Sequence, residues 1–75
     1  MDGITQLLIA THLVESVIGN KYVNGILNHL FLNNTVLFEV EWYGQTQTTW
    51  EPLINVKHLK ILHQYLLTND LLKPL

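Results

Sequence analysis

The sequence predicts a small α+β domain in which a curved sheet of three antiparallel strands packs against a C-terminal helix. An alternating pattern runs through 36–43 and puts one set of side chains on each face of a strand: Val36, Phe38, Val40 and Trp42 on one, and Leu37, Glu39, Glu41 and Tyr43 on the other. Similar patterns predict strands over 22–31 and 46–51, and helical spacing of apolar residues predicts a helix over 56–67. Because three strands cannot bury a sheet face alone, this helix must pack across the sheet.

Residues that favour turns separate the predicted elements. Gly25 indicates a bulge or bend in the first strand, and Asn33-Asn34 indicates a turn because Asn tolerates positive φ. Gly44 allows a tight turn into the return strand. Pro52 should end that strand because it cannot donate a ladder hydrogen bond.

The predicted core combines apolar residues of the sheet with those of the last helix. Trp is usually buried, and we expect Trp50 to face this helix. The predicted structural core is Phe38, Val40, Trp50, Leu62 and Tyr65.

The chain divides into an extension, a domain and a tail. Residues 1–19 are predicted to form an amphipathic N-terminal helix, capped by Asp2 and stopped by Gly19-Asn20. Residues 20–70 form the predicted domain, and 71–75 an apolar C-terminal tail.

Composition restricts the classes of function. The chain is 48% hydrophobic and only 13% charged, so we expect another chain to cover part of its apolar surface. The net charge is −2 and all four cations are Lys, which argues against direct nucleic-acid binding. No apolar run approaches the roughly 20 residues of a membrane span, and the first 19 residues lack the features of a signal peptide.

The side chains that could carry chemistry are not spaced for it. His58 and His63 would lie about 140° apart on a helix, which does not suit one metal ion. Glu39 and Glu41 share a strand face, which is more often solvated than catalytic. No nucleophile motif or phosphate loop is present in the sequence. We therefore expect no enzymatic activity, no metal and no cofactor.

Four short motifs in order make residues 22–67 resemble a chromodomain, the three-strand-plus-helix module of heterochromatin proteins, Polycomb-type proteins and some retroelement integrases. The motifs are Val23-Asn24-Gly25-Ile26-Leu27-Asn28-His29, Glu39-Val40-Glu41-Trp42-Tyr43-Gly44, Thr49-Trp50-Glu51-Pro52, and Asn55 through Tyr65. The resemblance implies that a histone tail enters as an extra strand between the domain's N-terminal segment and the segment before the last helix. It also implies a cage of three aromatic rings that holds methyl-lysine by cation–π attraction.

The cage implied by the resemblance is incomplete. Trp42 matches the central aromatic residue, but Lys21 stands at the first tyrosine position and would repel a cationic ligand. Gln45 stands at the third position. Tyr22 and Tyr43 lie close in sequence to the missing positions but are expected on the opposite strand face, unless a bulge redirects Tyr43.

Other positions of the implied peptide groove match the family better. Val23 matches an apolar contact to the inserted tail, and Glu51 and Asn55 match residues that form hydrogen bonds with it. Each has an ordinary alternative, as a core residue, a surface carboxylate and the cap of the last helix. Incomplete cages resemble those of some retroelement-integrase chromodomains and of shadow chromodomains, which bind proteins or dimerise.

We therefore expect a nuclear, non-catalytic protein-interaction module whose partner is a chromatin protein or a histone tail. The alternatives are a methylated histone H3 tail reader with a rearranged cage, and the C-terminal chromatin-targeting domain of an LTR-retrotransposon integrase. The apolar N-terminal helix further predicts a homodimer formed through it. That helix could instead fold back on its own sheet.

Overall fold

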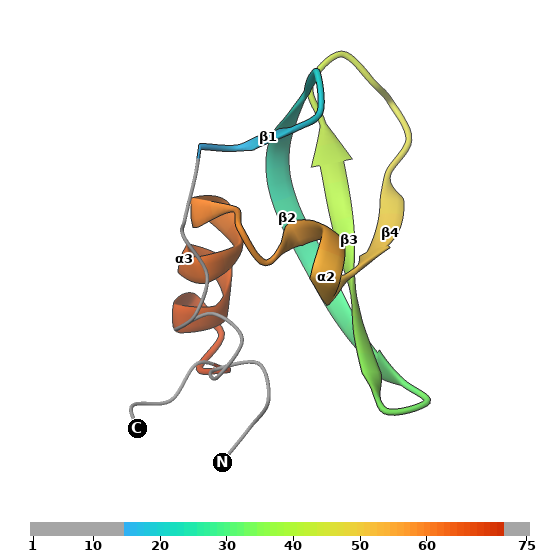
Figure 1. The fold of residues 1–75 in the computed structure, drawn as a ribbon, viewed down its shortest axis with the longest axis vertical. Coiled ribbons are helices and arrows are strands. Elements are labelled where there is room, and N and C mark those ends of the chain that lie inside the picture. Colours follow the sequence, from blue (N-terminus) through green and yellow to red (C-terminus); the bar gives the residue numbers. More distant parts are fainter. Residues whose placement is uncertain (1–14, 72–75) are drawn as a thin grey trace.

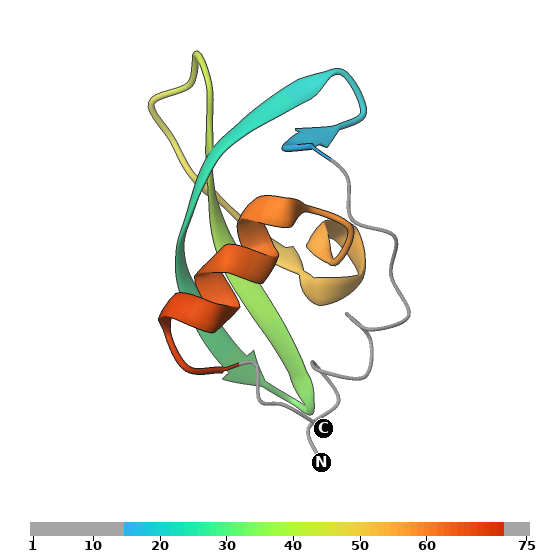
Figure 2. The same ribbon diagram turned by 90° about the vertical axis from the view of Figure 1, so that its left-hand side faces the viewer.

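Residues 15–71 are described by a computed structural model, and they form a curled four-stranded antiparallel sheet, a half-barrel, followed by helices (Figure 1). The elements are β1 (Val17–Ile18), β2 (Lys21–Leu32), β3 (Thr35–Trp42), β4 (Thr49–Pro52), α2 (Leu53–Val56) and α3 (Lys60–Thr68). The strands lie in the order β1-β2-β3-β4, and α3 crosses the hollow side of the sheet (Figure 2). The predicted α+β class and C-terminal helix are confirmed, but the sheet has a fourth strand, β1.

The longest strand, β2, is bent by irregular pairing with β3. Its register shifts between Val23 and Gly25, and again between Ile26 and Asn28. An extra residue in one strand increases the local twist, so these shifts help the strand to curl around the core. The predicted irregularity at Gly25 is confirmed.

The turn between β2 and β3 is set by two asparagines. Asn33 and Asn34 have φ values of 50° and 64°, in the left-handed region. Such a pair is typical of the two-residue hairpin turn whose twist matches that of the strands. The predicted turn is confirmed.

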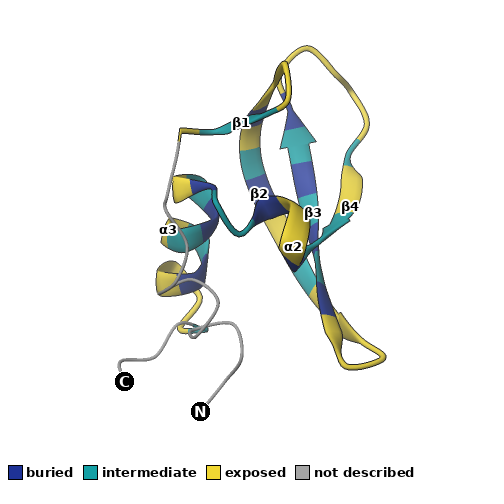
Figure 3. Cartoon of the chain, viewed as in Figure 1, coloured by how far each residue is buried: buried dark blue, intermediate teal, exposed yellow. Residues whose placement is uncertain are grey.

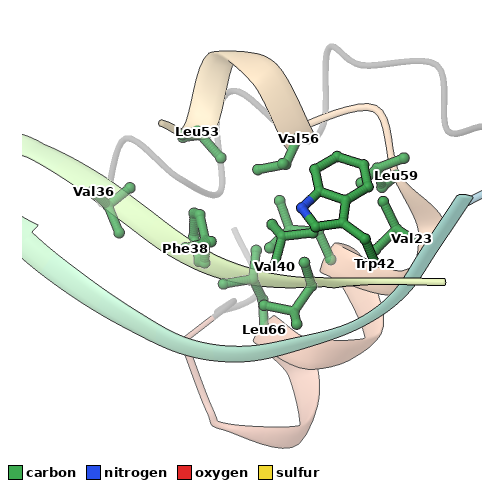
Figure 4. Close-up of a cluster of buried hydrophobic side chains, with 11 residues drawn as sticks. Val23, Val36, Phe38, Val40, Trp42, Leu53, Val56, Leu59 and Leu66 are labelled. Carbon is green, nitrogen blue, oxygen red and sulfur yellow. The ribbon is translucent and has the colours of Figure 1, made fainter. Parts of the chain in front are cut away.

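The core lies between the hollow face of the sheet and the helices (Figures 3 and 4). Alternate residues of β3 point inward, as the sequence pattern predicts. Phe38, Val40 and Leu62 are completely buried, and Tyr65 is partly buried against them. The other buried side chains are Val23, Ile26, Val36, Trp42, Leu53, Val56, Leu59 and Leu66.

The prediction that Trp50 is a core residue is wrong. Its residue is 46% exposed, whereas Trp42 is only 7% exposed. Trp50 pairs with Glu39, an outward-facing residue of β3, so the register places the Trp50 ring outside. Thr49 faces inward instead, and its Oγ1 accepts a hydrogen bond of 2.8 Å from Nε1 of Trp42.

The return strand is shorter than predicted. The predicted turn at Gly44 is present, because the Gln45 N–H donates a 3.3 Å hydrogen bond to the Trp42 carbonyl. Residues 43–48 form a loop, in which Gly44 has a φ of 78°, and β4 begins only at Thr49. Thr48 was expected in the strand, but its Oγ1 donates a 2.6 Å hydrogen bond to Oε2 of Glu39. Polar residues that alternate in a loop can mimic a strand pattern without pairing.

The predicted single helix over 56–67 is two helices, and Asn55 is not its cap. Asn55 lies inside α2, whose N-cap is Pro52, while α3 begins after Leu59. Leu59 has an extended backbone (φ −86°, ψ 129°) and is completely buried. Burial of this side chain accompanies the break between the helices, which local apolar spacing could not reveal.

The predicted N-terminal helix is wrong at its C-terminal end. Val17 and Ile18 form β1, which pairs with the start of β2, and β-branched residues favour strands. The sheet therefore begins before residue 20, where the domain was predicted to start. The rest of that helix, 1–14, and the tail residues 72–75 lie outside the described residues. No helix within 15–71 is long and apolar enough to cross a membrane.

Candidate functional site

The residue at the centre of the implied cage, Trp42, belongs to the core. Figure 4 shows its ring among Val23, Val56 and Leu59. The Nζ atom of Lys21 lies 5.8 Å from the centroid of the Trp42 ring, within the range of a cation–π contact. The protein's own cation therefore stacks on the ring to which the resemblance assigns a ligand cation.

The two tyrosines near the missing cage positions lie away from Trp42. Tyr22 and Tyr43 are 63% and 66% exposed, and the Tyr43 N–H donates a 3.0 Å hydrogen bond to the Tyr22 carbonyl. Their strand neighbours Val23 and Trp42 pair with each other and point inward. The tyrosines are thus cross-strand neighbours on the outer face, so the structure does not bring three rings together around Trp42.

The three remaining groove residues are divided between two places. Val23 is 1% exposed, and its N–H donates a 2.8 Å hydrogen bond to the carbonyl of Ser16, which precedes β1. The residues of the second place lie at the junction of β4 and α2, where Nδ2 of Asn55 donates a 3.2 Å hydrogen bond to Oε1 of Glu51. The structure therefore brings Glu51 and Asn55 together and assigns Val23 to the core.

The sheet has open edges that could accept another strand. Among residues 15–71, β4 has a partner only on its β3 side, and β1 pairs with β2 only at Lys21 and Tyr22. An unpaired edge presents backbone N–H and C=O groups to which an extended peptide can bind. The Glu51–Asn55 pair lies at the end of the β4 edge.

An ordered row of polar groups crosses the outer face of the sheet, and the sequence did not reveal it as a unit. Glu39 accepts hydrogen bonds from Nδ2 of Asn28 (2.9 Å) and from Oγ1 of Thr48. The Asn28 bond, and then the Thr48 bond, lower the pKa of Glu39 below its ordinary value. Nδ2 of Asn24 donates a 2.7 Å hydrogen bond to Oε1 of Glu41. The alternation of β3 was the available signal, because it places both carboxylates on this face.

Two histidines differ in whether their ring nitrogens have a hydrogen-bond partner. Nδ1 of His29 lies 2.8 Å from the hydroxyl oxygen of Tyr65, and burial raises the pKa of this tyrosine. Nδ1 of His63 is buried without a hydrogen-bond partner. Within 15–71, no three His, Cys, Asp or Glu side chains gather into a group that could hold a metal ion.

Comparison of the chain with protein-family models, with curated proteins and with solved structures finds no match.

Proposed function

We propose that the chain is a non-catalytic protein-interaction module of chromodomain type, which acts on chromatin in the nucleus. The curled sheet with its C-terminal helix is compatible with the fold that the resemblance implies. The partner is a histone tail or another chromatin protein, added as an extra strand at the β4 edge. Glu51 and Asn55, which share a hydrogen bond at the end of this edge, are the residues expected to bind polar groups of the peptide.

The contact between Lys21 and Trp42 is the observation that supports weak binding of methyl-lysine. A bound methylammonium would have to displace the Lys21 ammonium from the ring. Tyr22 and Tyr43 supply no further cage walls, because they lie on the outer face. Most of the cation–π attraction of a complete cage is therefore missing, at about 0.5–2 kcal/mol per ring.

The test is an NMR titration of the isotope-labelled chain with unmodified and trimethylated histone H3 tail peptides. We expect both to bind with dissociation constants of about 1 mM or weaker, which corresponds to about −4 kcal/mol. Chemical shifts should change along β4 and at Asn55. Micromolar binding that requires trimethylation and is lost in Trp42→Phe would contradict weak reading.

A charge-matched pair of variants tests the groove itself. Glu51→Gln removes a carboxylate at the β4–α2 junction, whereas Asp70→Asn removes one from an exposed position after α3. Asn also tolerates the positive φ of 56° at position 70. We expect only Glu51→Gln to weaken peptide binding, and equal effects would argue against the groove.

We also propose that the chain forms a homodimer through its N-terminal segment, whose apolar residues exceed what a small domain buries. Sedimentation equilibrium of 1–75 and of 15–75 at micromolar concentration tests this. The truncation keeps β1 and should be monomeric, while the full chain should be a dimer. A full chain that sediments as an 8.7 kDa monomer would exclude the dimer.

A further inference from the structure

The outer face of the sheet carries large apolar side chains that no described residue covers. The register places Leu30, Leu37 and Pro52 side by side on three neighbouring strands, with Trp50 in the adjacent row. Leu30 is 47% exposed and Trp50 is 46% exposed. Leu32, 49% exposed, extends the same face towards the β2–β3 turn.

The helices cannot cover this face, because they pack on the hollow side of the sheet (Figure 2). Both ends of the described chain also lie on the helix side. Oε1 of Glu15 is 3.3 Å from Nζ of Lys60 in α3, and Leu71 packs against the core.

Two carboxylates border the apolar residues, and the described chain supplies no cation to them. Glu39 lies beside Trp50 in the ladder, and Glu41 is the next outward residue of β3. Their hydrogen bonds come from neutral amide and hydroxyl groups, which position the carboxylates without neutralising them. The only ion pair within 15–71 joins Lys60 to Glu15, on the other side of the sheet.

Charge decides between the possible occupants of this face. Residues 1–14 contain no Lys or Arg, so they cannot provide counter-charges for Glu39 and Glu41. Lys73 follows only two residues after Leu71, which packs against the core on the helix side, so it is too close to that side to reach them. A second copy of the chain, docked by two-fold symmetry on the same patch, would bring carboxylates near carboxylates. A segment of another protein with apolar side chains flanked by lysine or arginine satisfies both the apolar and the acidic parts.

We infer that the outer face of the sheet, formed by Leu30, Leu37, Trp50, Pro52, Glu39 and Glu41, is a docking surface for such a basic, amphipathic segment of a partner protein. Trp50 is the central contact, because partly exposed aromatic rings on a rigid strand dominate the energetics of many interfaces. The carboxylates orient the segment and accelerate its association. The surface includes Trp50 and Pro52 of β4, but it consists of outward side chains, whereas the edge proposal uses the unpaired backbone of β4 with Glu51 and Asn55. Glu51→Gln therefore tests the edge alone, and Glu39→Gln tests the outer face alone.

The probe is a synthetic peptide that alternates lysine with leucine, compared with its counterpart in which glutamate replaces lysine. Titrated into the labelled full chain, the lysine peptide should shift the Trp50 indole resonance and the amides of 37–41. Binding should weaken as salt rises, and the glutamate peptide should not bind. Equal binding of both peptides, or shifts confined to α2 and α3, would overturn the inference.

Matched variants separate this surface from non-specific binding. Trp50→Ala should weaken binding of the lysine peptide by about tenfold, and Glu39→Gln by about threefold. Ile54→Ala truncates another exposed apolar residue, 63% exposed on α2, and should change the affinity little. Circular dichroism checks that each variant is folded, and Glu39→Gln tests the surface without altering an apolar contact. Equal losses for Trp50→Ala and Ile54→Ala would contradict the assignment.

The same variants distinguish self-association through this face from binding of another protein. If the full chain is a dimer that Trp50→Ala converts to a monomer, the occupant is a second copy and the inference is wrong. If Trp50→Ala leaves the oligomeric state unchanged but abolishes peptide binding, the partner is another protein, as inferred.

Discussion

Replacing Trp42 with alanine should destabilise the domain far more than replacing Trp50. Trp42 is 7% exposed, and its Nε1 donates a hydrogen bond to Thr49, whereas Trp50 is 46% exposed on the outer face. The alternation of β3 points Trp42 inward with Phe38 and Val40, and the pairing of Glu39 with Trp50 places Trp50 on the opposite face. The pair of variants is therefore a direct test of this register.

The difference in burial sets the magnitude. Exposures of 46% and 7% differ by 39 points, and because an aromatic side chain can bury about 150–250 Å², this is roughly 60–100 Å². At 25 cal/mol per Å² that area corresponds to about 1.5–2.5 kcal/mol. Truncation of a buried aromatic residue costs about 3–5 kcal/mol, so we expect that loss for Trp42→Ala. Subtracting the difference leaves about 1.5–2.5 kcal/mol for Trp50→Ala.

Urea unfolding followed by circular dichroism measures both losses without relying on tryptophan emission. Because a domain of this size has about 5 kcal/mol of stability in total, Trp42→Ala should retain at most about 2 kcal/mol and unfold at low urea concentration. Trp42→Phe provides a folded variant whose loss can be measured. Acrylamide quenching adds an independent test, because the indole that remains in Trp42→Phe should be accessible and that in Trp50→Phe protected.

Equal losses of stability for Trp42→Ala and Trp50→Ala would refute the register. So would an indole that is protected from acrylamide in Trp42→Phe, because this variant keeps only Trp50. Either result would mean that β4 is shifted by one residue relative to β3 and that its side chains face the opposite way.

Three further predictions concern single contacts. Tyr65→Phe keeps the ring but removes the hydroxyl beside Nδ1 of His29, so the free energy of unfolding should fall by about 1 kcal/mol in urea titrations; an unchanged value would show that this bond adds nothing. Asn34→Val forces a β-branched residue into a φ of 64° and should lower the melting temperature through a loss of about 1–2 kcal/mol, whereas Asn34→Gly should be tolerated. The folded-state pKa of Glu39 lies below its ordinary 4.5, so the stabilisation from this group is present above pH 4.5 and is lost as the pH falls through the lowered value. Asn28→Ala removes a hydrogen bond to the carboxylate and should raise the pKa of Glu39 in a carbon-detected NMR titration. An unchanged pKa would refute the assignment of its cause.

Local features of the sequence were enough to predict the β2–β3 hairpin. The alternation from Val36 to Trp42 identified the buried face of β3, because successive side chains of a strand point to opposite sides. Asn33-Asn34 identified the turn, and Gly25 the irregular pairing, since both depend on backbone preferences of the residues themselves. The last helix was also predicted, although its start was not.

The candidate site was harder to predict from the sequence, because the roles of its residues depend on which way their side chains point. The motifs named Trp42, Tyr22 and Tyr43 as possible cage residues, but burial and strand alternation separate their rings. They also named Glu51 and Asn55, which the chain brings within hydrogen-bond distance at the β4–α2 junction. The outer-face surface was not identified, because exposure of Leu30 and Trp50 follows from which face the helices cover.

The sequence by itself therefore determined the order of the β2–β3 hairpin, the buried face of β3 and the presence of a C-terminal helix, all of which follow from periodicity and turn residues. Only the tertiary structure decided that Trp42 rather than Trp50 enters the core, that Leu59 breaks the helix, and that the chain before residue 20 adds a strand. These outcomes depend on contacts between residues distant in sequence. Each of these features lowers the free energy of the folded state only once its partners are in place. They are the register between β3 and β4, the buried Leu59 between the two helices, and the added edge strand β1.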